Sequence, residues 1–212
     1  MTQDRGTVIV VAVLGGTGKE GSGLAMRWAL NGYQVIIGSR DAERAATRAA
    51  EMNEKLGGAY LTGMDNAAAA TAADIVVLSV PYSAHHATID SVKDKLGGKV
   101  FVDLTVPLNP PKVRTVHVPE GKAAALEAQS YVGEGVRVVA AFQNVSAEKL
   151  ADPDIKVDCD VLVCGDDDAA KADVIRLAEA AGMRGVDAGA LANAVAVEAL
   201  TPVLLYINKK YS

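Results

Sequence analysis

The sequence predicts an α/β fold whose mostly parallel sheet is covered by helices on both faces. Apolar segments rich in Val, Ile and Leu alternate with Ala-rich segments of helical spacing along most of the 212 residues. The apolar segments are nearly continuous, which is typical of strands buried on both faces. A glycine-rich turn also joins the first strand to the first helix, within residues 8–21. Together these features predict a Rossmann-type doubly wound parallel sheet.

The first strand runs into a G-x-G-x-x-G turn formed by Gly16, Gly18 and Gly21. An amphipathic helix containing residues 24–30 follows, and a second strand, residues 34–38, completes a βαβ unit of about thirty residues. Backbone N–H groups at the start of such a helix attract anions, and glycine lets a phosphate approach closely. The turn therefore predicts a pyrophosphate site for a dinucleotide. An accidental glycine-rich loop is the alternative interpretation.

Ser39 and Arg40 stand at the tip of the second strand, about twenty residues past the glycines, and Arg44 follows one helical turn later. NAD-specific sites usually place Asp or Glu at this tip, where the carboxylate binds the ribose 2′-hydroxyl. A hydroxyl and two guanidinium groups instead suit a 2′-phosphate, so we expect NADP rather than NAD. Asp41 either turns back to the ribose or caps the helix predicted for residues 42–56, and the cap is the preferred interpretation.

Further strands are predicted between helical segments at residues 60–62, 75–80, 100–104 and 136–142. After Asn144 a turn at 152–154 precedes strand 160–164, helix 169–181, strand 184–187 and a final helix from 190 to about 208. We therefore expect a dinucleotide-binding Rossmann domain, residues 1–144, and a small C-terminal α/β lobe, residues 145–212, for substrate binding or dimerisation. In two-lobed enzymes of this kind, the second substrate lies between the lobes, beyond the carboxyl ends of the strands.

Three strand ends are candidate contacts for the bound molecules: residues 79–82, 105–111 and 141–147. At the first, an apolar or aromatic side chain is expected to pack on the nicotinamide, although a purely structural Pro-Tyr turn is equally compatible. The prolines of the second either make a rigid pocket wall or simply end a strand. The third enters the C-terminal lobe and is well placed to contact both bound molecules.

The sequence predicts no catalytic side chain and no metal site. His85 and His86 begin the helix after Tyr82, and a general acid is one hypothesis. A surface or partly buried imidazole is preferred, because no carboxylate is positioned by the sequence to orient either ring. Asp166 to Asp168 resemble an acidic metal site, but they stand at a predicted helix start, where carboxylates stabilise the helix dipole. The three dispersed histidines also argue against a metal cluster.

Composition and charge limit the partners. A formal net charge of -5 argues against nucleic acid, which requires basic surfaces. Cys159 and Cys164 fit neither a disulfide framework nor a C-x-x-C motif, so we expect buried strand thiols. Residues 1–7 lack the apolar region of a secretory signal, and no apolar run is expected to reach transmembrane length. We therefore expect a cytoplasmic protein that acts on a small molecule and has no membrane partner.

The order and spacing of the motifs resemble those of the F420H2:NADP+ oxidoreductase family, the NADPH-dependent reductases of the deazaflavin coenzyme F420. The resemblance covers nearly the whole chain, although several of the motifs are general Rossmann fragments. They are A-V-L-G-G-T-G at 12–18, I-I-G-S-R at 36–40, L-S-V-P at 78–81, D-L-T-V-P-L at 103–108, A-A-F-Q-N-V-S-A at 140–147, V-C-G-D-D-D at 163–168, D-A-G at 187–189 and A-L-T-P at 199–202.

The resemblance implies that NADP and coenzyme F420 both bind, and it assigns residues to four regions. They are Thr17, Gly18, Lys19 and Glu20 on the pyrophosphate turn; Ser39, Arg40 and Arg44 at the 2′-phosphate; Val80 and Tyr82 on the nicotinamide side; and Leu108, Val145, Ala147 and Asn193 around the cleft where the two rings meet. The implied chemistry is direct hydride transfer between C4 of the nicotinamide and C5 of the deazaflavin. The protein then mainly stacks the rings and excludes water.

Two other functions stay open at this point. One is an NADPH-dependent reductase of another acceptor, such as an imine, a flavin or ferric iron, because other proteins share this N-terminal lobe. The other is a non-catalytic module that senses NADP(H) and controls a partner. The family also suggests a homodimer, for which the apolar final helix, residues 191–207, either supplies the interface or belongs to the core.

Overall fold

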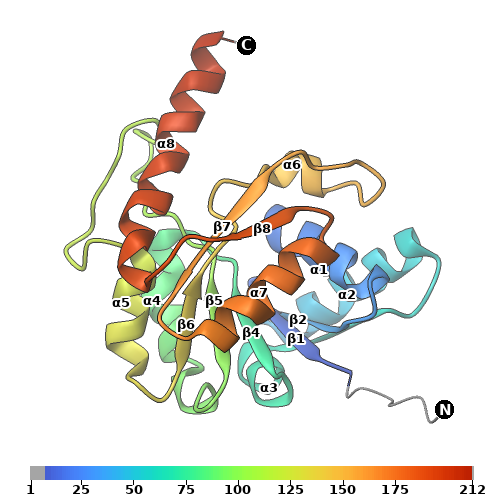
Figure 1. Cartoon of the computed structure of the whole chain (residues 1–212). Coiled ribbons are helices and arrows are strands. Elements are labelled where there is room, and N and C mark those ends of the chain that lie inside the picture. The colour runs from blue at the N-terminus through green and yellow to red at the C-terminus, as the bar shows by residue number, and fades with distance from the viewer. Residues whose placement is uncertain (1–7, 212) are drawn as a thin grey trace, which may run out of the picture.

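An eight-stranded sheet forms the centre of the computed structural model, which describes residues 8–211. Residues 1–7 and 212 lie outside the described part, and with them the segment on which the expectation of no secretory signal rests. Neighbouring strands are parallel except β6 and β7, and the order is β3-β2-β1-β4-β5-β6-β7-β8 (Figure 1). The strands are β1 (Val10–Leu14), β2 (Gln34–Ser39), β3 (Leu61–Asp65), β4 (Ile75–Leu78), β5 (Val100–Asp103), β6 (Arg137–Ala140), β7 (Asp160–Gly165) and β8 (Arg184–Asp187). The sheet confirms the predicted doubly wound α/β fold.

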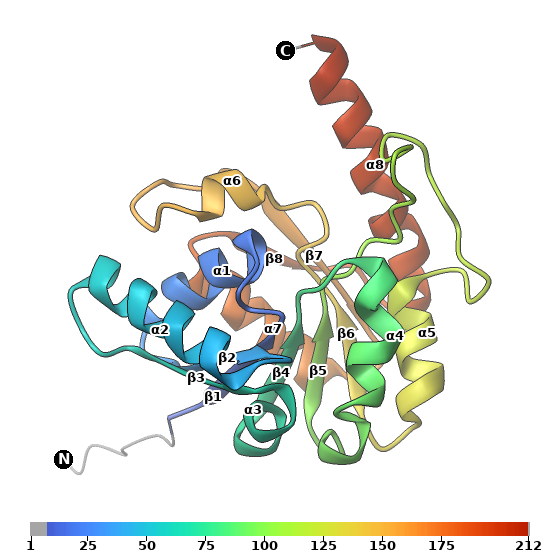
Figure 2. The ribbon, with the colours of Figure 1, turned by 180° about the vertical axis from the view of Figure 1, so that it is seen from behind.

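Helices cover both faces of the sheet (Figures 1 and 2). They are α1 (Lys19–Leu30), α2 (Ala42–Leu56), α3 (Asn66–Ala72), α4 (Tyr82–Asp90), α5 (Ala124–Val132), α6 (Ala147–Leu150), α7 (Asp168–Ala180) and α8 (Ala194–Tyr211), with 3₁₀ turns η1 (Lys93–Lys95) and η2 (Leu191–Asn193). Buried side chains of α1, α2 and α7 form one apolar cluster with one face of the sheet. Side chains of α3, α4, α5 and the start of α8 form a second cluster with the other face. Both faces of the central strands are therefore dry, as their continuous apolar composition predicts.

The strand order reverses at β1. Strands β2 and β3 continue from β1 in one direction, whereas β4, β5 and β6 continue in the other. At such a reversal the chain leaves neighbouring strands toward opposite faces, which opens a crevice beyond their carboxyl ends. The connections from β1 to α1, from β2 to α2 and from β4 to α4 all meet there. This edge of the sheet is where a ligand site is expected.

The C-terminal region continues the same sheet. Strand β7 pairs antiparallel with β6, through Val139 opposite Gly165 and Ala140 opposite Cys164, and β8 adds in parallel to β7. Helix α7 packs on the face that α1 also covers. The predicted α/β content of this region is thus present, while its division from the first 144 residues stays a prediction.

Two carboxylates cap helices as expected. Asp41 accepts hydrogen bonds from the backbone N–H groups of Glu43 and Arg44 at the start of α2. Asp167 accepts one from the N–H of Ala170 at the start of α7. Of the two thiols, Cys164 is buried in β7 as predicted, whereas Cys159 lies just before that strand and is only partly buried.

Helix α8 differs from the expectation that no apolar segment reaches transmembrane length. Residues 191–211 form a segment long and apolar enough to cross a membrane by length and composition alone, so the expectation of no such run is wrong. Glu198 and Pro202 lie within this segment, but its mean hydropathy is still high enough for a membrane-spanning helix. The first half of α8 is held by the protein, because the Glu198 carboxylate accepts from the N–H groups of Ala124 and Ala125 at 2.7 and 3.0 Å. The second half projects from the body of the protein (Figure 1).

Arg27 joins α1 to segments more than a hundred residues away. Its buried guanidinium donates to four backbone carbonyls, at 2.7 Å to Asp152, 2.8 Å to Ile155, 3.2 Å to Ala181 and 3.3 Å to Lys149. The neighbouring Trp28 indole donates to the Leu177 carbonyl at 2.8 Å. These bonds fix the α6 segment and the end of α7 against the Rossmann core.

We expect Arg27→Met to lower the free energy of unfolding by about 2–4 kcal/mol, because it leaves one buried and three partly buried hydrogen-bonded carbonyls without a charged donor. Urea denaturation of the whole chain measures this change. Arg176→Ala is the control: Arg176 pairs with Asp173 on the exposed side of α7, and its loss should cost less than about 1 kcal/mol. Equal losses in the two variants would contradict the role given to Arg27.

Candidate functional site

A groove of about 240 Å³ lies at the point where the strand order reverses. Connections after β1, β2 and β4 line it together with the start of α3 and one side of α4. The lining residues are Gly15, Thr17, Gly18, Ser39, Arg40, Arg44, Asn66, Ser79, Val80, Pro81, Ala84 and Thr88. The structure therefore brings six predicted residues to one groove: Thr17, Gly18, Ser39, Arg40, Arg44 and Val80.

The first position of the turn after β1 has no room for a side chain. Gly15 adopts a φ of +74°, and a Cβ there would lie 2.5 Å from the Ser79 carbonyl oxygen on the neighbouring connection. Its N–H donates to the Gly38 carbonyl of β2 at 3.1 Å. At Gly21 a Cβ would lie 3.1 Å from Gly16 Cα, so this glycine allows close packing of helix and turn. Sequence reasoning named Gly16, Gly18 and Gly21, but it missed Gly15, which alone among these four has a positive φ.

Gly18 differs from its neighbours in the turn. It is the N-cap of α1 with a φ of -75°, and the nearest atom to an added Cβ would be 3.4 Å away. The fold itself therefore tolerates a side chain here, and the glycine keeps the helix N-terminus open to a ligand. The first N–H groups of α1 have no partner within the helix and carry its positive end. Burial raises the pKa of Glu20 to about 8, so this carboxyl is mainly neutral at pH 7 and opposes an anion little.

The tip of β2 presents positive charge without a competing carboxylate. Asp41 is turned into the cap of α2, and its own N–H donates to the buried Ser39 hydroxyl at 3.3 Å. Arg40 and Arg44 are exposed beside the groove, and neither forms an ion pair within residues 8–211. The arrangement fits a dianionic phosphate bound through paired, charge-assisted hydrogen bonds.

Asn66 is a groove residue that sequence reasoning missed. Its side chain is buried, and Oδ1 has no hydrogen-bond partner in the part of the chain that the structure describes. A buried acceptor without a partner is costly, unless a bound molecule supplies the donor. A ribose hydroxyl has the required chemistry. In the sequence, the position of Asn66 directly after strand β3 could have identified it as a candidate.

Four predicted residues of the ring cleft lie outside this groove. Ala147 lines a neighbouring groove of about 430 Å³ between α1, α2 and α6, which also includes Lys19 from the pyrophosphate turn. Val145 is buried in the core, and Leu108 lies in the long connection after β5. Asn193 donates through Nδ2 to the Ala188 carbonyl at 2.7 Å. The roles of these residues stay predictions.

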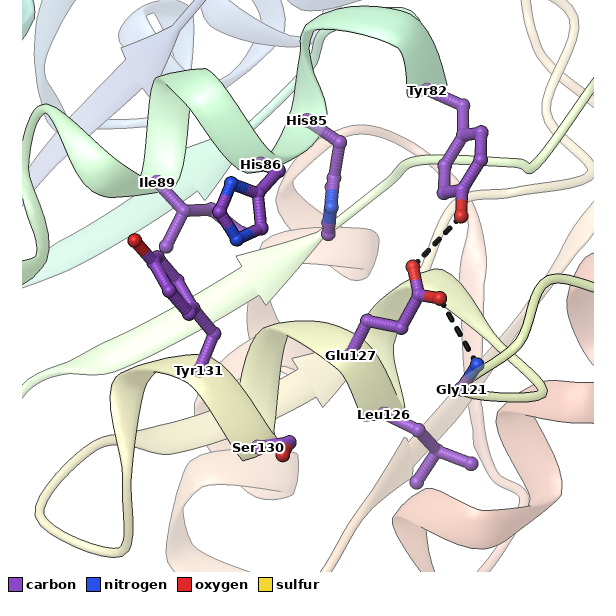
Figure 3. A pocket seen from close by; sticks show the side chains of 9 residues that line it. All are labelled: Tyr82, His85, His86, Ile89, Gly121, Leu126, Glu127, Ser130 and Tyr131. Carbon is purple, nitrogen blue, oxygen red and sulfur yellow. Dashed lines mark hydrogen bonds between the residues drawn. The ribbon is translucent and has the colours of Figure 1, made fainter.

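Tyr82 lines a separate pocket of about 730 Å³ between α4 and α5 (Figure 3). Its hydroxyl donates to Glu127 at 2.9 Å, and the other oxygen of that carboxylate accepts from the Gly121 N–H. Burial and this bond raise the pKa of Tyr82 to about 12. Since Ala84 and Thr88 face the groove, α4 separates the groove from this pocket. Val80 and Tyr82 therefore lie on different sides of α4, and the nicotinamide contact of Tyr82 stays a prediction.

His85 differs from its expected state. The imidazole is buried, and Nε2 lies 2.6 Å from Oδ2 of Asp103 at the end of β5. The expectation of a surface or partly buried ring without an orienting carboxylate is therefore wrong for His85, because β5 carries Asp103 beneath α4. It is correct for His86, which is exposed and packs against Tyr131 with ring centroids 4.2 Å apart. His85 lies between Tyr82 and His86 on the pocket wall (Figure 3).

Asp103 connects several strand ends. Its Oδ1 accepts from the Thr105 N–H at 2.9 Å, and its carbonyl accepts from Gln143 Nε2 at 2.8 Å. Gln143 is buried, its Oε1 has no partner within the described residues, and its carbonyl accepts from the Thr201 hydroxyl at 2.7 Å. Phe142, just before it, has a φ of +73°, an uncommon backbone conformation that often marks functional sites. Sequence reasoning placed Gln143 within the strand end 141–147 that is expected to contact both bound molecules, but it gave Asp103 no role.

Comparison with known proteins identifies relatives along most of the chain. A family model described as NADP oxidoreductase, coenzyme F420-dependent, matches residues 10–107. An F420-dependent NADP reductase from Methanothermobacter marburgensis is 43% identical over 207 residues, which cover 94% of this chain and 92% of that protein. A rat protein named metalloreductase STEAP3 is 30% identical over 190 residues, but the match spans only 36% of its length.

A similar solved structure comes from Arthrobacter sp. FB24 and is described as a candidate F420-dependent NADP-reductase. It has a TM-score of 0.79 and 25% sequence identity, and the match covers 96% of this chain and 94% of that one. The likeness therefore includes the C-terminal region as well as the Rossmann core.

The glycines of the turn allow a test that separates folding from binding. We expect Gly15→Ala to lower the free energy of unfolding by about 3 kcal/mol, because of its positive φ and the contact with Ser79. Gly18→Ala should change it by less than about 1 kcal/mol. Gly18→Ala should nevertheless raise the Kd for NADPH at least tenfold, as measured by fluorescence titration, because the new Cβ occupies the approach of the pyrophosphate. Unchanged binding by Gly18→Ala would contradict this assignment.

Proposed function

The chain belongs to the coenzyme F420-dependent NADP oxidoreductase family, and we propose that it transfers a hydride between NADP(H) and coenzyme F420. The observation that carries the proposal is the groove at the strand reversal. It combines a helix N-terminus for a pyrophosphate with Arg40 and Arg44 for a 2′-phosphate. Capping by Asp41 removes the carboxylate that would favour NAD.

The residues of the groove suit NADP in detail. Gly15 and Gly18 leave the space that a pyrophosphate needs, and Asn66 offers a buried acceptor to a sugar hydroxyl. Val80 supplies an apolar surface at the end of the groove that lies along β4. These contacts bind and orient the dinucleotide, which leaves the reactive end near the carboxyl ends of β4 and β5.

The reaction needs little chemistry from side chains. NADP(H) and F420 are themselves hydride carriers, exchanging the hydride between C4 of one ring and C5 of the other. The protein's tasks are to hold two rings at reacting distance and to exclude water. On the second-substrate side we propose that Leu108, Val145, Ala147 and Asn193 border the cleft, with Tyr82 on the nicotinamide side.

A stopped-flow comparison of acceptors tests the function. We expect rapid oxidation of NADPH with coenzyme F420, at least a hundredfold faster than with FMN or a ferric chelate. NADH should be a much poorer donor. Arg44→Ala should raise the KM for NADPH about tenfold or more and leave the KM for NADH nearly unchanged, because only NADPH carries the 2′-phosphate.

Other outcomes of this comparison would favour the alternatives. Faster reaction with the ferric chelate or FMN would indicate a reductase of another acceptor. Tight NADPH binding without hydride transfer to any acceptor would indicate a sensing module. Equal use of NADH and NADPH would contradict the role of Arg40 and Arg44.

We further propose that a second copy of the chain covers helix α8, giving a cytoplasmic homodimer. Large apolar side chains are exposed along α8: Leu200, Val203, Leu205, Tyr206, Ile207 and Tyr211. Contiguous exposed apolar surface usually marks an interaction site. The projecting part, residues 203–211, is only about 13 Å long at 1.5 Å per residue, which is too short to span a bilayer.

Sedimentation equilibrium with detergent-free protein tests this interface. We expect a dimer for the natural chain and a monomer for Val203→Glu with Ile207→Glu, because two charges replace apolar contacts. Lys209→Glu serves as a control at the same end of the helix and should remain dimeric. A monomeric natural chain, or one that sediments only with added lipid vesicles, would contradict the proposal.

A further inference from the structure

The His85–Asp103 pair is a buried polar group to which the proposed hydride transfer gives no role. The two side chains are 4% and 1% exposed, and their closest atoms are 2.6 Å apart. Burying a charged pair is expensive unless its geometry is good and its remaining atoms are hydrogen-bonded. A buried pair of this kind therefore suggests a specific role. It lies at the carboxyl edge of the sheet, beside the proposed ring cleft.

Each oxygen of Asp103 holds a different element. Oδ2 contacts His85 on α4, Oδ1 accepts from the Thr105 N–H in the connection after β5, and the carbonyl accepts from Gln143 after β6. The Thr105 hydroxyl also reaches the Val80 carbonyl at 3.5 Å. The backbone segments that carry Val80, Leu108 and Val145 thus share one anchor.

Loss of the His85 contact would leave the Asp103 carboxylate buried, with the backbone N–H of Thr105 as its remaining hydrogen-bond donor among the described residues. A buried carboxylate in that state either takes up a proton or rotates toward another donor. Both changes weaken its bond to Thr105 and free the connection after β5. Displacements of about 1 Å in a site of this kind can slow a reaction about a hundredfold.

We propose that His85 is a positioning residue for hydride transfer: its hydrogen bond to the Asp103 carboxylate fixes the Thr105 connection that walls the ring cleft. This inference rests on the proposed function. His85 faces the pocket between α4 and α5, away from the groove, so it acts through Asp103 and touches neither ring.

Charged and titratable groups face His85 from every neighbouring element. They are Asp103 from β5, Tyr82 and His86 from α4, Glu127 from α5, Glu198 from α8, and His117, whose ring lies near that of Tyr82. Burial disfavours the imidazolium, but the hydrogen bond and charge of Asp103, with the charges of Glu127 and Glu198, outweigh it and raise the pKa of His85. His85 therefore holds Asp103 as a charged partner at pH values below this raised pKa. This charged contact is lost as the pH rises through the pKa.

The test compares His85→Gln with His86→Gln. A glutamine amide is neutral, does not titrate and cannot replace a charged partner of Asp103, whereas His86 is an exposed imidazole one residue away without a bond to Asp103. Two measurements are made across pH 5.5–9 on the full chain. One is the single-turnover rate of F420 reduction by NADPH, and the other is the amide resonance of Thr105 in the NADP complex.

We expect both measurements to titrate together in the natural chain, with a midpoint above the ordinary value of 6.5. In His85→Gln the titration should disappear, and the turnover rate at pH 7 should fall about tenfold while the Kd for NADPH stays within twofold. His86→Gln should behave like the natural chain. In a third measurement, an NMR titration of the His85 imidazole resonance in the NADP complex, Asp103→Asn should lower the midpoint.

Three results would overturn the proposal. They are a Thr105 titration that persists in His85→Gln, its loss in His86→Gln, and an unchanged rate and pH profile in His85→Gln. A natural chain that reduces no F420 would refute the proposed function instead. The Thr105 and His85 resonances in the NADP complex report on the anchor without any acceptor, so the two failures are distinguishable.

Discussion

The ligand groove depends on one spatial constraint, the lack of room for side chains where the chain leaves β1. Gly15 packs against the Ser79 carbonyl of one neighbouring connection while its N–H bonds to the Gly38 carbonyl of β2. This contact holds β1 between β2 and β4 at the point where their connections separate. The N-terminus of α1 is thereby aimed along the crevice, and the groove lined by Thr17, Arg40 and Val80 follows from it.

Local charge then decides which dinucleotide the groove suits. The chain as a whole is acidic, so an anionic cofactor must be bound by local cations and helix dipoles. Asp41 would oppose a 2′-phosphate if it faced the ribose, but two backbone N–H groups of α2 hold it as a cap. The same short segment therefore ends a strand, starts a helix and leaves Arg40 and Arg44 available.

Buried polar contacts link the far end of the sheet to the candidate cleft. Asp103 joins α4, the connection after β5 and Gln143, and Thr201 of α8 bonds to the Gln143 carbonyl. Glu198, one turn earlier on α8, caps α5, and burial raises its pKa to about 8. The helix that presents the exposed apolar surface is thus attached to the residues behind the cleft. The proposed dimer interface and the proposed reaction site share these contacts.

The sequence by itself determined the features that are encoded within a few neighbouring residues. Alternating apolar and helical segments predicted the doubly wound sheet, and turn and cap chemistry predicted the glycine turn, the bounds of α2 and the cap by Asp41. Only the tertiary structure decided what depends on which strand end lies beneath which helix. It paired His85 with Asp103, placed Gly15 against the Ser79 carbonyl, left Asn66 Oδ1 without a partner among residues 8–211 and separated Tyr82 from Val80. Strand order sets these contacts, because it brings together strand ends that are far apart in the chain, and no short window of sequence records it.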